Sequence, residues 1–231
     1  MQYPWPYTKL DPEVTRRIAH DNYFGGACAY GASSAIIHQL RDKIGYPYTI
    51  LPADMFKYGE GGAVGWGTLC GALNGAAAVI TLVAGDKYHQ LVDEMIGWYT
   101  VYPFPSDKSN QYAQDGTFKE YKVQKELPKN VSGSPLCHVS VTRWCKETGY
   151  ASGSPERSER CARLTGDTAA HAVELLNKLQ AGQVVSKFEL DETTEECRTC
   201  HAKGKDFEIG GWTRGKLKCT NCHEPHENPF K

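Results

Sequence analysis

Two short motifs near the end of the chain constrain its fold more than any other feature. Residues 197–201 and residues 219–223 both read C-x-x-C-H. In this spacing the two thiols add to the vinyl groups of a haem, while the adjacent imidazole binds the iron from one face. The motifs therefore predict two covalently attached haem c groups. The residues that would hold them are Cys197, Cys200, His201, Cys219, Cys222 and His223.

The four cysteines of these motifs also have the spacing of a zinc ribbon, in which two C-x-x-C turns supply four thiolates to one metal ion. A zinc ion satisfied by four sulfurs has no use for His201 and His223. Haem attachment, in contrast, needs a histidine at that position in both motifs. A pair of disulfides would also leave both histidines without a role. The complete, repeated motif therefore favours haem.

The charge balance of the chain excludes some classes of function. The 231 residues include 26 Lys and Arg against 27 Asp and Glu. This balance indicates neither a nucleic-acid surface nor a polybasic membrane anchor. Two haems would add negatively charged propionates, which favours basic redox partners over acidic ones.

The first residues of the chain bear on its compartment. Haem is attached to C-x-x-C-H motifs on the outer side of the bacterial inner membrane. Residues 1–6 contain no basic segment followed by an apolar run. We therefore expect a mature, periplasmic form from which a signal peptide has been removed.

Helix signals dominate residues 1–182 and predict an all-α body. Residues 11–13 read Asp-Pro-Glu, which combines an N-cap oxygen, a first-turn proline and an acid near the positive end of the helix dipole. A break is expected at residues 25–26, both glycine, and Asp167 is expected to recap a helix after Gly166. The predicted helices cover residues 11–24, 27–44, 52–58, 67–84, 87–99, 135–146, 154–166 and 168–180, with loops and a short hairpin at 117–123 between residues 101 and 134.

One uncharged segment is long enough to span a bilayer. It runs over twenty-five residues, 61–85. Seven glycines and Asn74 argue against a membrane span. We therefore predict a buried core helix over residues 67–84.

Residues 183–231 differ from the rest of the chain. They are polar and too poor in aliphatic side chains to form a core unaided. In such a segment the haems themselves would be the apolar filling. We expect a second domain here, a C-terminal and mostly irregular dihaem arm, after a helical domain of residues 1–182.

The second axial ligand of each haem separates an electron carrier from a catalyst, because an open position lets a substrate reach the iron. The three methionines lie far from the motifs in sequence, so histidine is the expected ligand. His226 follows His223 too closely to oppose it on one haem, but it could serve the neighbouring haem or a partner subunit. His20 lies near a helix end and could project outward. The ordinary alternative for both is a surface histidine.

Five further cysteines remain, namely Cys28, Cys70, Cys137, Cys145 and Cys161. Their odd number means that disulfides cannot use them all. Three of them fall in one helical region, residues 137–161, and Cys70 lies among glycine and alanine residues that allow close backbone approach. We predict metal ligation by Cys70, Cys137, Cys145 and Cys161, most simply in an iron-sulfur cluster. The alternative is that these residues are small buried hydrophobes.

Two motifs in this order resemble a known family. Residues 70–75, Cys-Gly-Ala-Leu-Asn-Gly, resemble the C-G-A-x-x-G signature of small redox proteins with several invariant cysteines. The same module followed by two C-x-x-C-H motifs resembles the split-Soret cytochromes c of sulfate-reducing bacteria, over essentially the whole chain. The resemblance implies a homodimer with two face-to-face, bis-histidine haems per subunit. It further implies that the distal histidines come from the partner subunit and that cysteines of the helical body hold an iron-sulfur centre.

The sequence therefore predicts an electron carrier that passes single electrons between other redox proteins. An enzyme is the first alternative: the haems would feed electrons to a cysteine-ligated iron-sulfur site that is open to a small substrate. A zinc-ribbon interaction module is the second alternative, and it predicts a colourless protein.

Overall fold

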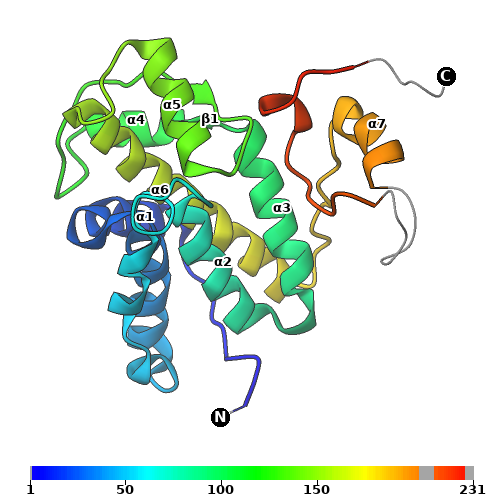
Figure 1. The fold of residues 1–231 in the computed structure, drawn as a ribbon. Coiled ribbons are helices and arrows are strands. Elements are labelled where there is room, and N and C mark those ends of the chain that lie inside the picture. Colours follow the sequence, from blue (N-terminus) through cyan, green and yellow to red (C-terminus); the bar gives the residue numbers. More distant parts are fainter. Residues whose placement is uncertain (1, 203–210, 227–231) are drawn as a thin grey trace. The chain divides into compact units, whose positions relative to one another are not determined.

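A computed structural model describes residues 2–202 and 211–226, and it is mainly α-helical (Figure 1), as the sequence predicted. The chain divides into two compact units, residues 1–187 and residues 188–231, which we call the helical unit and the C-terminal unit. The elements in chain order are α1 (Pro12–Ile44), η1 (Tyr48–Ile50), η2 (Ala53–Gly59), α2 (Gly71–Ala84), η3 (Gly85–Lys87), α3 (Tyr88–Val101), β1 (Pro103–Phe104), α4 (Asp107–Gln114), β2 (Asn130–Val131), α5 (Cys137–Thr148), α6 (Pro155–Gln180), α7 (Glu192–His201) and η4 (Cys219–Asn221).

The predicted break in the first long helix is confirmed. α1 starts where the sequence indicated, with the Asp11 carboxylate accepting the backbone N–H of Glu13 at 2.8 Å. Gly26 and Ala27 leave helical geometry, and Ala27 has a φ of 61°. The two halves of α1 therefore meet at a kink, and the second half begins anew at Cys28.

The segment between α3 and α5 differs from the prediction. The hairpin expected at residues 117–123 is absent from the described chain, and the two strands are β1 and β2, paired antiparallel in a two-stranded sheet. A helix that the sequence analysis missed, α4, is capped by Ser106, whose side chain accepts the N–H of Ser109. The sequence did contain a helix-start signal here, because Ser106 is a favourable N-cap residue and the acidic Asp107 follows it.

α6 is one continuous helix, so the predicted recapping at Asp167 is wrong. Gly166 lies inside the helix, and a Cβ built there would be 2.6 Å from the Arg16 carbonyl oxygen of α1. The glycine is thus needed for close packing, not for termination. The Asp167 carboxylate accepts hydrogen bonds from the backbone N–H of Ser106 at 2.8 Å and from the Ser109 hydroxyl at 2.6 Å, and it pairs with the Arg16 guanidinium.

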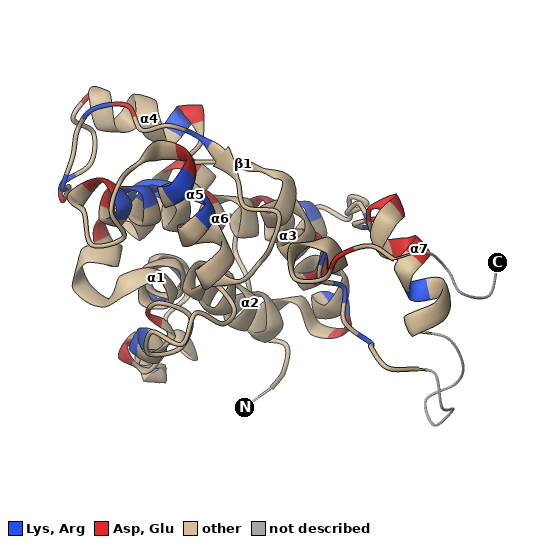
Figure 2. Cartoon of the chain, turned by 45° about the horizontal axis from the view of Figure 1, so that its top comes forward, with Lys and Arg blue, Asp and Glu red and all other residues tan. Residues whose placement is uncertain are grey.

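α2 is the predicted core helix, although it begins four residues later than expected. It carries no charged residue, and Figure 2 draws it without a blue or red segment. A Cβ at Gly75 would lie 2.2 Å from the Ala29 carbonyl oxygen of α1. The two helices therefore approach as closely as backbone allows. No helix in the described residues is both long enough and apolar enough to cross a membrane.

Replacing Gly75 by Ala should lower the free energy of unfolding by about 1–3 kcal/mol, the usual cost of overpacking a core. The added methyl group would meet a backbone carbonyl that cannot move without separating α1 from α2. Gly25→Ala is the matched control, because a Cβ there has only an ordinary 3.8 Å contact with Tyr30. Urea denaturation of both variants measures the difference, and equal stabilities would contradict the close packing.

Candidate metal centre and C-terminal motifs

Four thiols of the helical unit lie close enough to influence one another's ionisation. They belong to Cys28, Cys70, Cys137 and Cys161, which we call the four-thiol cluster. Burial raises the pKa of Cys28 well above its ordinary value, and the charges of the other three thiols add to this effect. All four are free cysteines, and all but Cys137 are buried.

Three of these thiols stand at helix N-termini. Cys28 begins the second half of α1 directly after the kink, Cys70 is the N-cap of α2, and Cys137 is the first residue of α5. The free N–H groups and the dipole at a helix N-terminus favour negative charge and stabilise a thiolate. The fold thus places three of the thiols at the positive ends of helices, where negative charge on a metal-bound sulfur would be favoured.

Backbone hydrogen bonds hold the starts of α2 and α5 side by side. An isolated antiparallel bridge joins the residues that precede the two cysteines. The N–H of Cys70 donates to the Pro135 carbonyl at 2.8 Å, and the N–H of Cys137 donates to the Thr68 carbonyl at 2.7 Å. The main chain therefore fixes the distance between these two helix N-termini.

The fourth thiol, on α6, brings two arginines to the cluster. Cys161 follows Arg160, and Arg157 lies one helical turn before it. Burial lowers the pKa of Arg160, but charge interactions with Cys161, Tyr99 and Cys70 outweigh burial and raise it. Figure 2 shows the basic residues gathered on the first half of α6. Positively charged side chains thus lie beside the thiols in the interior of the helical unit.

The four-thiol cluster offers the donor atoms that an iron centre uses, although its side chains are not arranged as a finished metal site. Burial raises the pKa of Cys70, and burial together with the neighbouring thiols raises the pKa of Cys137 to about 12. In residues 2–202 and 211–226, no three His, Cys, Asp or Glu side chains are grouped as metal ligands. A cysteine sulfur changes position by rotation about χ1 alone, however, and thiolates are the preferred ligands of iron-sulfur centres. A bound cation would offset the repulsion between the sulfurs in their ionised form.

The structure groups the thiols differently from the predicted ligand set, which itself stays a prediction. Cys28, which the sequence analysis left out of the ligands, interacts with all three other members of the cluster. Cys145, which was included, lies at the edge and has Cys161 as its neighbouring thiol. The missed signal was the glycine pair at residues 25–26, because a helix break just before a cysteine places that cysteine at a helix start.

The first C-x-x-C-H motif occupies the last turns of α7. Asp191 caps this helix, accepting the N–H of Thr194 at 3.1 Å and the Thr194 hydroxyl at 2.7 Å. Cys200 and His201 are exposed at the end of the helix. The His201 carbonyl accepts the N–H of Trp212 at 2.9 Å, which joins the helix to the chain that leads to the second motif.

The two motifs lie close together within the C-terminal unit. Partial burial raises the pKa of Cys197, and the neighbouring thiol of Cys219 in the second motif raises it further. The His201 ring lies edge-on to the ring of His226, with 5.8 Å between the ring centroids. His223, like the two other histidines of this unit, is exposed. The unit therefore brings together thiols and imidazoles from both motifs and from the segment after them.

His20 is placed differently from the expectation. It is fully buried, with Nε2 2.9 Å from a Glu159 carboxylate oxygen and Nδ1 3.2 Å from an Asp21 carboxylate oxygen. Its ring stacks on Phe118 at 3.5 Å between centroids. Because both ring nitrogens already have partners, His20 is neither a surface histidine nor available as a metal ligand in this arrangement. It instead links α1 to α6.

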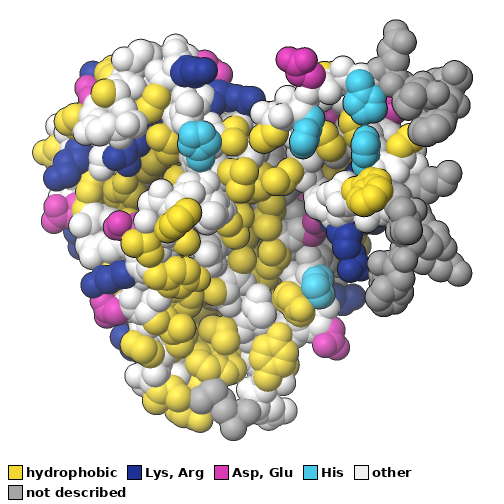
Figure 3. All heavy atoms as spheres, in the orientation of Figure 1, with side chains coloured by type: hydrophobic (Ala, Val, Ile, Leu, Met, Phe, Trp, Pro, Cys, Tyr) yellow, Lys and Arg dark blue, Asp and Glu magenta, His cyan; other side chains and the backbone are white. Residues whose placement is uncertain are grey.

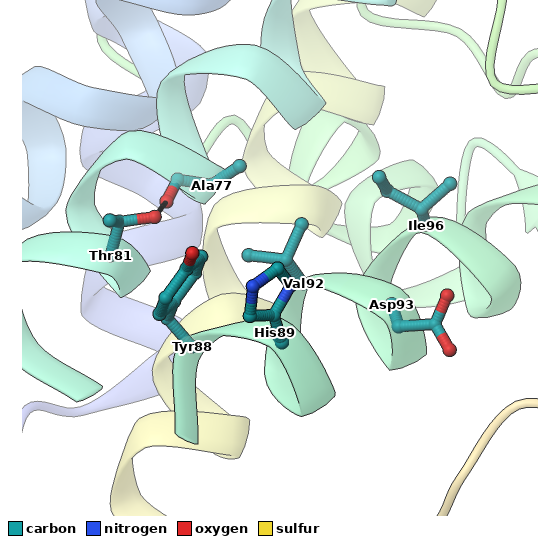
Figure 4. A pocket seen from close by; sticks show the side chains of 7 residues that line it. All are labelled: Ala77, Thr81, Tyr88, His89, Val92, Asp93 and Ile96. Atoms are coloured by element: carbon teal, nitrogen blue, oxygen red, sulfur yellow. Dashed lines mark hydrogen bonds between the residues drawn. The ribbon is translucent and has the colours of Figure 1, made fainter. Parts of the chain in front are cut away.

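A shallow groove of about 230 Å³ lies between α2 and α3 (Figure 4). The His89 ring borders it and stacks on Tyr88 at 4.2 Å between centroids. Hydrophobic side chains are also spread over the face of the helical unit seen in Figure 3. The large exposed ones in residues 46–66 are Tyr46, Ile50, Met55, Tyr58, Val64 and Trp66.

Comparisons with known proteins agree with this combination of features. Residues 30–175 match the family described as "Putative redox-active protein (C_GCAxxG_C_C)". The chain is 38% identical over 227 residues to the split-Soret cytochrome c of Desulfovibrio desulfuricans, a match that covers 96% of this chain and 78% of the relative. A solved structure described as "A novel iron centre in the split-Soret cytochrome c from Desulfovibrio desulfuricans ATCC 27774" has a TM-score of 0.84 and 37% identity, over 98% of this chain and 94% of that chain.

This chain departs from the pattern that the family is named for. The signature expected from the sequence, C-G-A-x-x-G, had its first two letters in the wrong order: the family name reads G-C-A-x-x-G, whereas Cys70, Gly71 and Ala72 place the cysteine before the glycine. A Cβ at Gly71 would lie 2.2 Å from the Gly59 carbonyl oxygen and 2.9 Å from the Cβ of Cys28. There is thus no room for a cysteine at residue 71. The thiol at residue 70 stands at the N-cap of α2 instead.

If the four-thiol cluster holds iron, replacing Cys28 by Ser should remove most of that iron from the purified protein, because Cys28 interacts with the three other thiols of the cluster. Cys145→Ser is the matched control and should retain the iron, since Cys145 lies at the edge. Iron analysis and electron paramagnetic resonance measure the outcome. Iron loss in Cys145→Ser but not in Cys28→Ser would restore the ligand set predicted from the sequence.

Proposed function

Because this chain belongs to the C_GCAxxG_C_C family of redox-active proteins and to the split-Soret cytochromes c, we propose that it is a dihaem c-type cytochrome that transfers single electrons between other redox proteins. The observation that carries the proposal is the pair of complete C-x-x-C-H motifs that lie together in the C-terminal unit. When bound, two haems supply one-electron oxidation and reduction.

Exposure of the motif residues supports haem attachment in the C-terminal unit. Cys200 and Cys222 are exposed, and Cys197 and Cys219 are partly exposed. A porphyrin therefore meets accessible thiols, and burial of its faces by the surrounding chain would supply the apolar contacts that this polar segment lacks. The role of the chain is to attach the two haems, to orient them with His201 and His223, and to exclude water from their faces.

His201 and His226 are the pair of imidazoles that would together hold one of the two haems. Their rings already lie near each other, with 5.8 Å between the centroids, so both could bind one iron without a large rearrangement of the chain. A histidine on each face would close the iron to substrates and favour outer-sphere electron transfer.

We also propose that the four-thiol cluster holds an iron centre, in a homodimer located in the periplasm. The iron centre of the similar solved structure supports the first part of this proposal. The dimer and the periplasm follow from the resemblance and from the place where haem c is attached. Burial of Cys28, Cys70 and Cys161 favours a carrier over an enzyme, because electrons reach a buried centre more easily than a substrate does.

Covalent attachment of two haems is tested by the mass and colour of the purified protein. The intact mass should exceed that of the bare chain by two haems, and acid acetone should leave the colour on the polypeptide, because thioether bonds survive this extraction. The double variant Cys197→Ala/Cys200→Ala should lose one haem, and Cys161→Ala should lose none. A colourless protein with the mass of the bare chain would support the zinc ribbon instead.

Replacing His226 by Ala should convert one of the two haems from low spin to high spin, because one iron loses its sixth ligand. His89→Ala, which changes the groove histidine, is the matched control and should leave both haems low spin. Visible spectra of the oxidised and reduced protein measure the spin state. An unchanged spectrum in His226→Ala would mean that the ligand opposite His201 comes from elsewhere, such as a second copy of the chain.

A further inference from the structure

One buried charge in the helical unit has no partner of opposite charge. Arg160 is buried, with only 1% of the residue exposed to solvent. Its guanidinium donates to the Ser140 hydroxyl at 3.0 Å and lies 3.5 Å from the Asn130 side-chain oxygen, both neutral groups. Its Nε has no hydrogen-bond partner. No carboxylate pairs with Arg160 in the part of the chain that the structure describes.

The other two buried arginines show what is missing. Arg16 pairs with Asp167 and Glu13, and Arg163 pairs with Glu159 at 3.0 Å. A buried guanidinium without such a partner is costly, and proteins rarely keep one without compensation. The compensation for Arg160 must therefore come from a group that is not a carboxylate.

The groups of potential negative charge around Arg160 are thiols and a phenol. Arg160 directly precedes Cys161 on α6, and its guanidinium bonds to Ser140, which lies one helical turn after Cys137 on α5. The Tyr99 hydroxyl donates to Ser140 at 3.1 Å, the same residue that accepts from Arg160. A cysteine binds a metal as a thiolate, which carries negative charge. A metal-loaded cluster would therefore supply the negative charge that Arg160 lacks.

We propose that Arg160 is the built-in counter-charge of the four-thiol cluster, and that it holds the reduction potential of the iron centre there more positive than thiolate ligation alone would. The half-buried Arg157 acts in the same sense but more weakly, because water screens it. This inference rests on the proposed iron centre. Each reduction step adds one electron and one unit of negative charge to the cluster, and a fixed positive charge in a low-dielectric interior stabilises the added charge.

The test compares Arg160→Met with Arg160→Lys in the full-chain holoprotein. Redox titration with dithionite, which supplies the electron, is followed by electron paramagnetic resonance of the non-haem iron. At a fixed potential, Arg160→Met should raise the ratio of oxidised to reduced centre at least tenfold, equivalent to about 59 mV for a one-electron couple. Arg160→Lys retains the charge and should stay closer to the wild type than Arg160→Met does.

Arg41→Gln is the control for loss of a positive charge elsewhere. Arg41 lies thirteen residues beyond Cys28 on the same helix, which at 1.5 Å per residue is about 20 Å away. The potential should not change in this variant. Arg157→Gln should shift it in the same direction as Arg160→Met but by less, and this variant reports on the inference even where Arg160→Met does not fold.

The stability of the iron-free protein shows whether Arg160 acts as a counter-charge or only supports the fold. After chelation of the non-haem iron, Arg160→Met should resist urea at least as well as the wild type, because an uncompensated buried charge has been removed. A structural role predicts loss of stability with and without iron, and equal effects of the Lys and Met variants. Wild-type protein without non-haem iron would overturn the proposed iron centre. Iron-loaded Arg160→Met and Arg157→Gln with unchanged potentials would overturn this inference alone.

Discussion

The helical unit depends on bringing the positive ends of three helices to one set of sulfur atoms. The second half of α1 begins after a kink, at Cys28. The backbone hydrogen bonds of Cys70 and Cys137 hold the starts of α2 and α5 side by side. Each helix end offers N–H groups that its own helix cannot use. An anionic cluster would be stabilised by these groups, so the arrangement of the helices suits the charge that metal-bound thiolates would carry.

Close packing of backbone makes this convergence possible. Cβ atoms at Gly59, Gly71 and Gly75 would each come within 2.4 Å of an atom of α1 or of η2. The same closeness explains why the cysteine of the family motif stands at residue 70 in this chain. Position 71 faces Cys28 and has no room for a side chain. Residue 70 lies at the N-cap of α2, where the positive end of the helix dipole stabilises a negatively charged sulfur.

Local signals in the sequence predicted local structure well, and long-range pairing decided the rest. Asp11 and Ser154 marked the two long helices correctly because a helix cap acts within four residues. Asp167 resembled a cap, but its partners Ser106 and Arg16 lie far away in sequence. The fold class could be predicted from the chain, and the C-x-x-C-H motifs could be recognised in it. Membership of Cys28 in the cluster and the burial of His20 could not, since both depend on contacts between distant segments.

The two units use cysteine in opposite ways, and exposure explains the difference. A thiol that attaches a haem has to be reached by a large porphyrin, and Cys200 and Cys222 are exposed. A thiol that holds a buried metal has to be shielded from oxidation and from competing ligands, and Cys28, Cys70 and Cys161 are buried. Shielding places negative charge in a low-dielectric interior, which requires positive charge nearby. Three helix N-termini stand at thiols of the cluster and Arg160 directly precedes Cys161, so positive charge is available to a negatively charged cluster in the core of closely packed helices.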